Sequence, residues 1–291
     1  MPSTKRTPVQ RRDVRARRVS VPHADSMPRH FMEGDLLQSQ IMAVLSATFP
    51  KGEQFFVDSV RAFREEIVDP ALQRQVAGFI GQESMHAREH DRLNDTLHRL
   101  GYPVRVVDTV TGAVLGLIQR AAPPSVRLAV TAAAEHYTSV LAEQLLTDDA
   151  LRSQRIPQDV RHLLLWHALE ECEHKAVAFD VYRECVDNEV LRRSVMHLFS
   201  GLVAIAAIVS LASTPLTDRD ARNPLHLVGS ILNLRRSPFA RKAIARHHLE
   251  YNRHGFHPDD RDTRDLVIRW NDALFGEGGE LVGLLAGADS A

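Results

Sequence analysis

Four short segments of this chain carry Glu and His residues at spacings that are typical of metal ligands on helices. In chain order they are Glu53, Glu83-x-x-His86, Glu135 and Glu171-x-x-His174. Residues three apart lie on one face of a helix, so each Glu-x-x-His pair can reach a single ion. A two-metal site in a four-helix bundle uses this set, with a Glu from each of two helices and a Glu-x-x-His pair from each of the others. The pattern predicts an all-α bundle.

Predicted turns place these residues at matching heights. One turn lies at Asp69 and Pro70, and Glu53 and Glu83 stand at nearly equal distances before and after it. Such residues are level in an antiparallel helix pair, because each residue rises by about 1.5 Å. A second turn, in about 149–157, lies at nearly equal sequence distances from Glu135 before it and Glu171 after it. Two hairpins therefore each present their acids at mid-height.

Three further histidines are candidate ligands. His167 lies one helical turn before Glu171, and His90 lies one turn after His86, so both can join the site at i, i+4 spacing. His136 adjoins the Glu of the third segment but points about 100° away from it on a helix, which makes it the weakest candidate. For each of the three, an ordinary hydrogen-bonded or exposed histidine is the alternative.

Other acids near the pattern are assigned different roles. Glu170 and Glu173 have no imidazole at the matching position, so they are not expected to be ligands. Glu89 is expected to be a solvated charge on a helix surface. Asp91 and Asp180 are candidate hydrogen-bond partners for ligand imidazoles.

Hard carboxylate oxygens with a few imidazoles suit iron, manganese or zinc, and no thiolate is expected to make this a soft site. We expect two metal ions, with iron favoured and manganese or zinc as alternatives. A di-iron version would activate O2, whereas a redox-inert version would hydrolyse its substrate with a metal-bound hydroxide. A non-catalytic metal-binding bundle is a third interpretation.

Helical periodicity, prolines and glycines divide the rest of the chain into further helices. The expected helices cover about 36–47, 50–68, 70–100, 111–120, 125–147, 157–186, 190–213, 224–234, 238–251 and 262–275. Residues 32–275 are expected to form one helical domain, with the bundle core in about 50–187 and C-terminal helices in about 190–275. Residues 1–31 are interpreted as a disordered basic tail and 276–291 as a flexible tail. A nucleic-acid or membrane-surface arm is the alternative for the basic run.

Composition constrains partners and compartment. Hydrophobic residues make up 44% and charged residues 25% of the chain, as in ordinary globular proteins. The formal net charge of −1 gives no support for nucleic-acid binding. Cys172 and Cys185 lie too far apart on one predicted helix to form a bridge, so a reducing cytoplasm is expected.

The most apolar segment is 198–212. It is shorter than the roughly 20 residues of a bilayer span, so a buried core helix is the expectation. Membrane contact through about 198–212, and hence membrane association, is the alternative. Pairing of two copies through an exposed helix face is also open.

Several segments resemble a bacterial family of predicted metal-dependent hydrolases. They are FPKGE at 49–53, FIGQESMH at 79–86, EHY at 135–137, WHALEECEHKAVAFD at 166–180 and FHP at 256–258. The resemblance covers about 32–260.

The ligand order is also similar to that of ferritin-like di-iron proteins, which implies a ferritin-like four-helix bundle with additional C-terminal helices. The added His167 resembles the seven-ligand di-iron sites of bacterial arylamine N-oxygenases, in which the extra His binds iron. This resemblance implies a ligand set of Glu53, Glu83, His86, Glu135, His167, Glu171 and His174. The first expectation is thus a di-iron oxygenase or oxidase acting on a small, apolar or lipid-like substrate, and the runner-up is a metal-dependent hydrolase.

Overall fold

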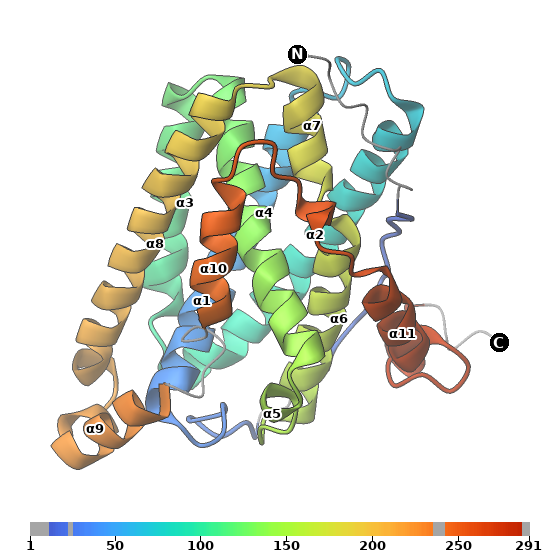
Figure 1. Cartoon of the computed structure of the whole chain (residues 1–291). Helices are drawn as coiled ribbons and strands as arrows, with labels where there is room; N and C mark the ends of the chain where they lie inside the picture. The colour runs from blue at the N-terminus through green and yellow to red at the C-terminus, as the bar shows by residue number, and fades with distance from the viewer. Residues whose placement is uncertain (1–11, 23–25, 235–241, 287–291) are drawn as a thin grey trace.

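The computed structural model describes residues 12–22, 26–234 and 242–286, and its regular structure is helical (Figure 1). The main helices are α1 (Leu36–Arg61), α2 (Pro70–Arg99), α3 (Val104–Ala121), α4 (Pro124–Thr147), α5 (Asp149–Arg152), α6 (Gln158–His174), α7 (Val177–Cys185), α8 (Glu189–Thr217), α9 (Pro224–Asn233), α10 (Lys242–Tyr251) and α11 (Arg264–Phe275). Within these described ranges there is no β-strand, only an isolated bridge between Val19 and Leu285. The predicted all-α class with additional C-terminal helices is confirmed, whereas ferritin-like kinship stays a prediction.

Four helices build the core of the bundle. α1 packs along α2, α4 packs along α6, and the two pairs pack against each other. The turn predicted between α1 and α2 is present: the Asp69 side chain accepts a hydrogen bond from the backbone N–H of Ala71 at 2.8 Å, and Pro70 occupies the first turn of α2. The pairing brings the middle of each helix to the same level, as the spacing of the acids predicted.

The predicted break before Pro50 is wrong, because α1 runs without interruption through that residue. A proline inside a helix removes the N–H that would bond to the carbonyl four residues earlier. Here that carbonyl belongs to Ser46, and the side-chain amide of Asn94 on α2 donates to it at 3.2 Å. A neighbouring helix thus satisfies the acceptor that the proline leaves open, and the helix continues.

Two other predicted boundaries also differ. The expected helix over 157–186 is two helices, α6 and α7, separated at Lys175 and Ala176. The Lys175 ammonium is buried there and donates to the backbone carbonyl of Arg261 at 2.6 Å. The helix expected over 111–120 begins earlier, since α3 already starts at Val104.

The predicted disordered tail of 1–31 is partly wrong. Val14, Val19 and Val21 are buried, and residues 12–22 cross α2, which we call the N-terminal strap. Residues 1–11 lie outside the described part. The predicted flexible tail of 276–291 is also partly wrong, because Leu281 is fully buried and the bridge at Leu285 joins it to the strap.

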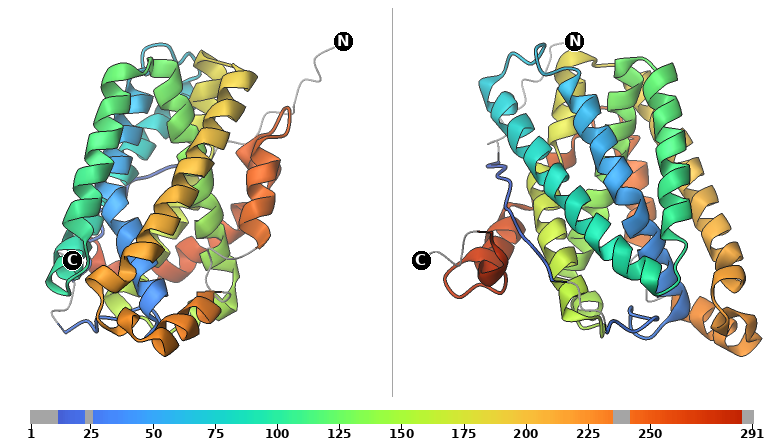
Figure 2. Two further views of the ribbon diagram at one scale, coloured as in Figure 1. Left: turned by 90° about the vertical axis from the view of Figure 1, so that its left-hand side faces the viewer. Right: turned by 180° about the vertical axis from the view of Figure 1, so that it is seen from behind.

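The expectation that 198–212 forms a buried core helix is wrong. This segment lies in α8, on the outside of the bundle, where Leu198, Ile205 and Ile208 are exposed (Figure 2). Among the described helices, α8 is long and apolar enough to cross a membrane by length and composition, yet only 11% of its most apolar window is buried. Burial in the protein core therefore does not explain its composition.

Candidate metal centre

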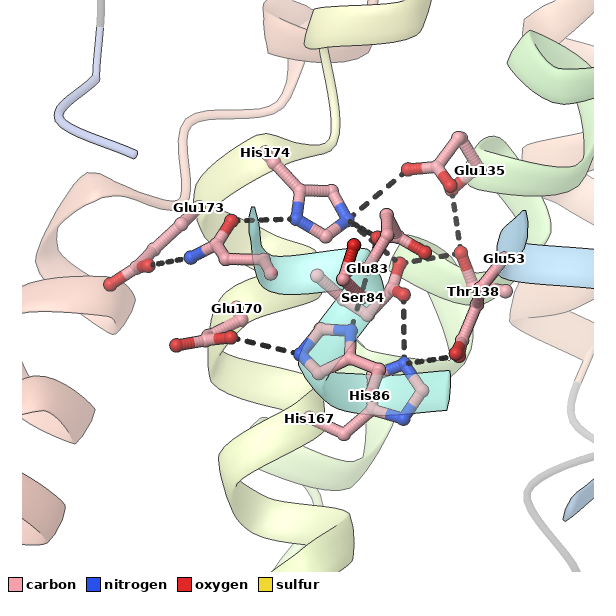
Figure 3. A network of polar contacts seen from close by, with 12 residues as sticks. Glu53, Glu83, Ser84, His86, Glu135, Thr138, His167, Glu170, Glu173 and His174 are labelled. Carbon is pink, nitrogen blue, oxygen red and sulfur yellow. Dashed lines mark hydrogen bonds and ion pairs between the residues drawn. The ribbon is translucent and has the colours of Figure 1, made fainter. Parts of the chain in front are cut away.

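All seven residues of the predicted ligand set converge between α1, α2, α4 and α6 (Figure 3). The set comprises Glu53, Glu83, His86, Glu135, His167, Glu171 and His174, and each is at most 5% exposed. Donor atoms of six of these residues form two groups in which every atom lies within 4.8 Å of the others. One group is Glu53, His86 and His167, and the other is Glu83, Glu171 and His174. The predicted convergence is present; binding of metal by these residues stays a prediction.

His174 is at the centre of the second group. Its Nε2 lies 3.1 Å from Glu83 Oε1, 3.2 Å from Glu135 Oε2 and 3.6 Å from Glu171 Oε2. Glu135 therefore belongs to this group by distance. Carboxylates from three helices meet around one imidazole nitrogen. A metal cation bound there would neutralise their negative charge.

Several buried polar atoms of the centre make no hydrogen bond. They are both carboxylate oxygens of Glu53, Glu83 and Glu135, Nδ1 of His86 and Nε2 of His174. Burying polar or charged groups without partners is costly, and proteins avoid it unless the groups are paired or bind metal. These atoms all face the same small space (Figure 3). The residues present therefore fit a pair of divalent cations.

The electrostatics lead to the same conclusion. Burial, and then the charges of Glu171 and Glu135, raise the pKa of Glu53 well above its usual value. Burial and Glu171 raise the pKa of Glu135 to about 7. Although burial opposes it, the carboxylates of Glu135 and Glu171 raise the pKa of His174. Without cations the cluster thus retains protons near neutral pH, and cations would replace them.

Each of the three imidazoles has its other ring nitrogen held by the protein. His86 Nε2 lies 2.9 Å from Glu170 Oε2. A carboxylate only accepts, so Nε2 carries the proton and Nδ1 keeps a lone pair directed at the centre. Glu170, which the sequence did not suggest as a ligand, therefore fixes the orientation of one.

His174 is held by an amide. Its Nδ1 lies 2.9 Å from Gln82 Oε1, and the Gln82 amide nitrogen donates to Glu173 Oε2 at 2.8 Å. The bond to Glu173 fixes which end of the amide faces the imidazole. Nδ1 of His174 therefore donates, and its Nε2 is free for a cation.

The third imidazole is held by a longer chain of bonds. Ser46 donates to Asn94 Oδ1 at 2.8 Å and lies 2.9 Å from His90 Nδ1. His90 Nδ1 then donates to Ser46, and His90 Nε2 accepts from His167 Nδ1 at 2.9 Å. His167 Nε2 faces the centre, where it lies 2.9 Å from Glu171 Oε1. His90, predicted as a candidate ligand, instead orients one; the signal in the sequence was its place one turn from His86.

Arg17 of the N-terminal strap joins two of these arrangements. Its guanidinium donates to Glu170 at 2.9 Å and to Glu173 at 2.9 and 2.6 Å. The Arg17 guanidinium thus holds both carboxylates: that of Glu170, which bonds to His86, and that of Glu173, which acts on His174 through Gln82. Sequence reasoning missed this residue, because Arg17 lay in a basic run interpreted as disordered.

Several expectations about neighbouring residues are corrected. His136 is not in the centre: its Nε2 lies 3.0 Å from the backbone carbonyl of His247. Asp180 pairs with His257 at 2.8 Å instead of holding a ligand imidazole. Glu89 is buried and accepts from the backbone N–H of Val21 in the strap at 3.0 Å, so it is not a solvated surface charge. The prediction for Asp91 stays untested.

An apolar pocket of about 110 Å³ reaches the centre. Its walls include Met42, Leu45 and Phe49 of α1, Leu141 and Leu145 of α4 and Leu164 of α6. Thr138, His167 and Glu171 give it a polar end. A larger pocket of about 700 Å³, lined by residues such as Phe31 and His162, contains none of the seven ligand candidates.

Comparison with protein families gives a match to the family described as predicted metal-dependent hydrolase, over residues 15–262. The chain belongs to this family. The matched region contains the seven candidate ligands and also Arg17. Comparisons with curated proteins and with solved structures gave no significant match.

Proposed function

We propose that this member of the predicted metal-dependent hydrolases is an enzyme with a dinuclear metal centre, acting on a small apolar molecule. The convergence of buried carboxylate oxygens and imidazole nitrogens on one small space, where several of them make no hydrogen bond, carries the proposal. Glu53, His86 and His167 would hold one cation, and Glu83, Glu135, Glu171 and His174 the other. Iron, manganese and zinc all accept these donors.

Divalent cations held here would lower the pKa of water and polarise a carbonyl or phosphoryl oxygen. The chain itself supplies position and exclusion of bulk water. The pocket walls bind the apolar part of the substrate and direct its reacting group to the polar end formed by His167 and Glu171. Thr138 donates to Glu171 Oε2 at 2.5 Å, which fixes that carboxylate at the boundary between pocket and centre.

Hydrolysis is the first candidate reaction, because the family description supports it. Water would be added across an ester, amide or phosphoester bond, so the reaction consumes no O2. Oxidation of the substrate with O2 is the second candidate, favoured by the specific combination of four carboxylates, three imidazoles and an apolar pocket. It requires an electron donor in addition to O2.

Turnover with and without O2 distinguishes these reactions. Protein loaded separately with iron, manganese or zinc would be offered acyl esters and phosphoesters under nitrogen, and apolar amines and hydrocarbons under air with a chemical reductant. Product formed under nitrogen supports hydrolysis. Product that needs O2 and reductant supports oxygenation. Absence of both in metal-loaded protein, across substrates that fit the pocket, would contradict the proposed enzyme.

A pocket variant tests the substrate class. Leu141→Trp would fill part of the pocket, which Thr138 also lines, while changing no candidate ligand. We expect the variant to keep its metal and to lose activity on apolar substrates by about ten-fold or more, because the substrate can no longer approach the centre. Unchanged activity in this variant would show that the pocket is not the substrate site.

A further inference from the structure

One side of the molecule is covered by apolar side chains that no part of the described chain packs against. Helices α3, α8 and α9 lie along this side, and each packs on α1 (Figure 2, left). All large apolar residues exposed on these three helices are Val, Leu or Ile. We call this surface the aliphatic face. Contiguous exposed apolar surface of this kind marks a contact with a partner or a membrane.

The middle of α8 is exposed on every side. All nine residues from 201 to 209 are exposed, although a helix lying flat on a bundle would bury some residue in every turn. Val195 and Met196 before this stretch, and Ser210 and Thr214 after it, are buried. The helix is therefore fixed to the bundle at both ends and stands away from it in between. An occupant of this region must surround an aliphatic helix instead of covering one flat side.

We propose that the aliphatic face is the surface by which the protein binds a lipid bilayer. Fluid acyl chains can fill the space around α8 on all sides, which a rigid protein surface does not do. Protein interfaces are enriched in aromatic residues, Met and Arg at their centres, whereas the exposed large apolar residues of this face are aliphatic. From Ser194 to Thr217 the sequence contains no Asp, Glu, Lys or Arg.

The charges at the edges of the face fit anionic headgroups. Arg105 and Arg120 are exposed near the two ends of α3, and Arg219 and Arg222 are exposed just after α8. Basic residues at the edge of an apolar surface add attraction to an anionic leaflet. Asp218 is buried and paired with Arg29 at 2.9 Å, so it adds no exposed negative charge. Asp220, between Arg219 and Arg222, is 59% exposed and offsets one of the four positive charges.

The face would lie in the plane of the membrane surface instead of crossing the bilayer. Both ends of α8 pack on the same bundle: Arg192 donates to the backbone carbonyl of Arg253 at 3.1 Å, and Leu211 packs against the buried Leu36 and Leu37 cluster. A spanning α8 would carry the attached bundle, with its charged outer surfaces, into the hydrocarbon. A helix that lies in the interface avoids that cost.

The test is flotation of the full-length, metal-loaded protein with vesicles of phosphatidylcholine and phosphatidylglycerol. We expect the protein to float with the vesicles, and the variant Ile205→Glu to bind about ten-fold or more weakly. The matched control is Ile268→Glu on α11, because Ile205 is 59% exposed and Ile268 is 60% exposed on a different side of the molecule. Circular dichroism and metal content would verify that both variants fold.

Three results would overturn the proposal. The first is a folded protein that does not float with the vesicles, and the second is equal binding by wild type and Ile205→Glu. The third is a vesicle-free dimer, seen by sedimentation velocity, that Ile205→Glu converts to monomers while vesicles bind neither form. That last result would assign the aliphatic face to a second copy of the chain. The test is independent of the proposed reaction, since it measures no turnover.

Discussion

At the residue scale, the centre is organised by which nitrogen of each histidine carries the proton. Spacing in the sequence predicted six of the ligands and made His167 a candidate, the resemblance added His167 to the set, and the structure brings all seven together. Spacing also ranked His136 below His90. It did not predict that His90 orients His167, or that His136 bonds to a backbone carbonyl outside the centre. The roles of these two histidines differ because other segments of the chain give them different hydrogen-bond partners. Residue spacing within one helix does not predict those partners.

Arg17 gives the sharpest prediction at this scale. Arg17→Gln removes the cation that holds Glu170 and Glu173, so we expect metal affinity to fall about 10- to 100-fold, as for other residues that position ligands. Competition with a chromogenic chelator measures it. Arg15→Gln is the control, because Arg15 is 79% exposed and pairs with Asp13 at the surface. Equal affinity in the two variants would show that Arg17 has no positioning role.

The raised pKa values predict how metal-free protein responds to pH. The pKa of Glu135 is raised to about 7 and that of His174 is also raised, so the folded state retains protons that the unfolded state releases. The stability from each group is present below its unfolded pKa, about 4.3 for Glu and 6.5 for His, and is lost as pH rises through the folded value. Thermal melts in chelator should therefore show Tm falling from about pH 6.5 to 8.

Metal-loaded protein is the comparison for this experiment. Bound cations take over the role of the retained protons, so its Tm should fall much less over the same pH range. A metal-free protein whose Tm rises across this range would contradict the electrostatic description of the centre.

At the element scale, the structure differs from the sequence prediction where one segment acts on another. Pro50 predicted a helix boundary, but Asn94 on α2 satisfies the carbonyl of Ser46 and α1 continues. The N-terminal strap has no helical periodicity, so nothing in its own sequence indicated that it packs. Its packing depends on α2, where Gly78 and Gly81 leave room for it.

These glycines test the link between strap and centre. A Cβ at Gly78 would lie 2.0 Å from the backbone oxygen of Val14, so Gly78→Ala must displace the strap. We expect the free energy of unfolding to fall by about 1–3 kcal/mol, as in overpacked sites. Because the displaced strap carries Arg17, metal affinity should fall as well. Chemical denaturation and chelator competition measure the two effects.

Gly201→Ala is the matched control, since Gly201 is also inside a helix but a Cβ there would meet nothing within 4 Å. Its substitution should raise stability by up to about 1 kcal/mol through helix propensity and leave metal affinity unchanged. A Gly78→Ala protein that behaves like Gly201→Ala would show that the strap does not rest on α2 as described.

At the scale of the whole molecule, the all-α class and the heights of the four acids could be predicted because both follow from local periodicity. The exposure of α8 could not. An aliphatic helix has the same sequence pattern whether protein or another apolar medium surrounds it. The exposure of α8 follows from its position on the outside of α1 and α4, which the sequence does not show. The molecule thus combines an interior polar centre with an aliphatic exterior face.

The central claim is that the buried Glu and His cluster binds two metal ions, and elemental analysis tests it most directly. Protein purified from cells supplied with iron, manganese and zinc would be compared with the double variant Glu83→Ala/Glu171→Ala. The control is Glu65→Ala, because Glu65 is exposed in the turn after α1. We predict about two transition-metal ions per chain in wild type and control, and in the double variant loss of at least the ion assigned to Glu83, Glu135, Glu171 and His174. A well-folded wild-type protein without stoichiometric metal, or a double variant that retains both ions, would contradict the account.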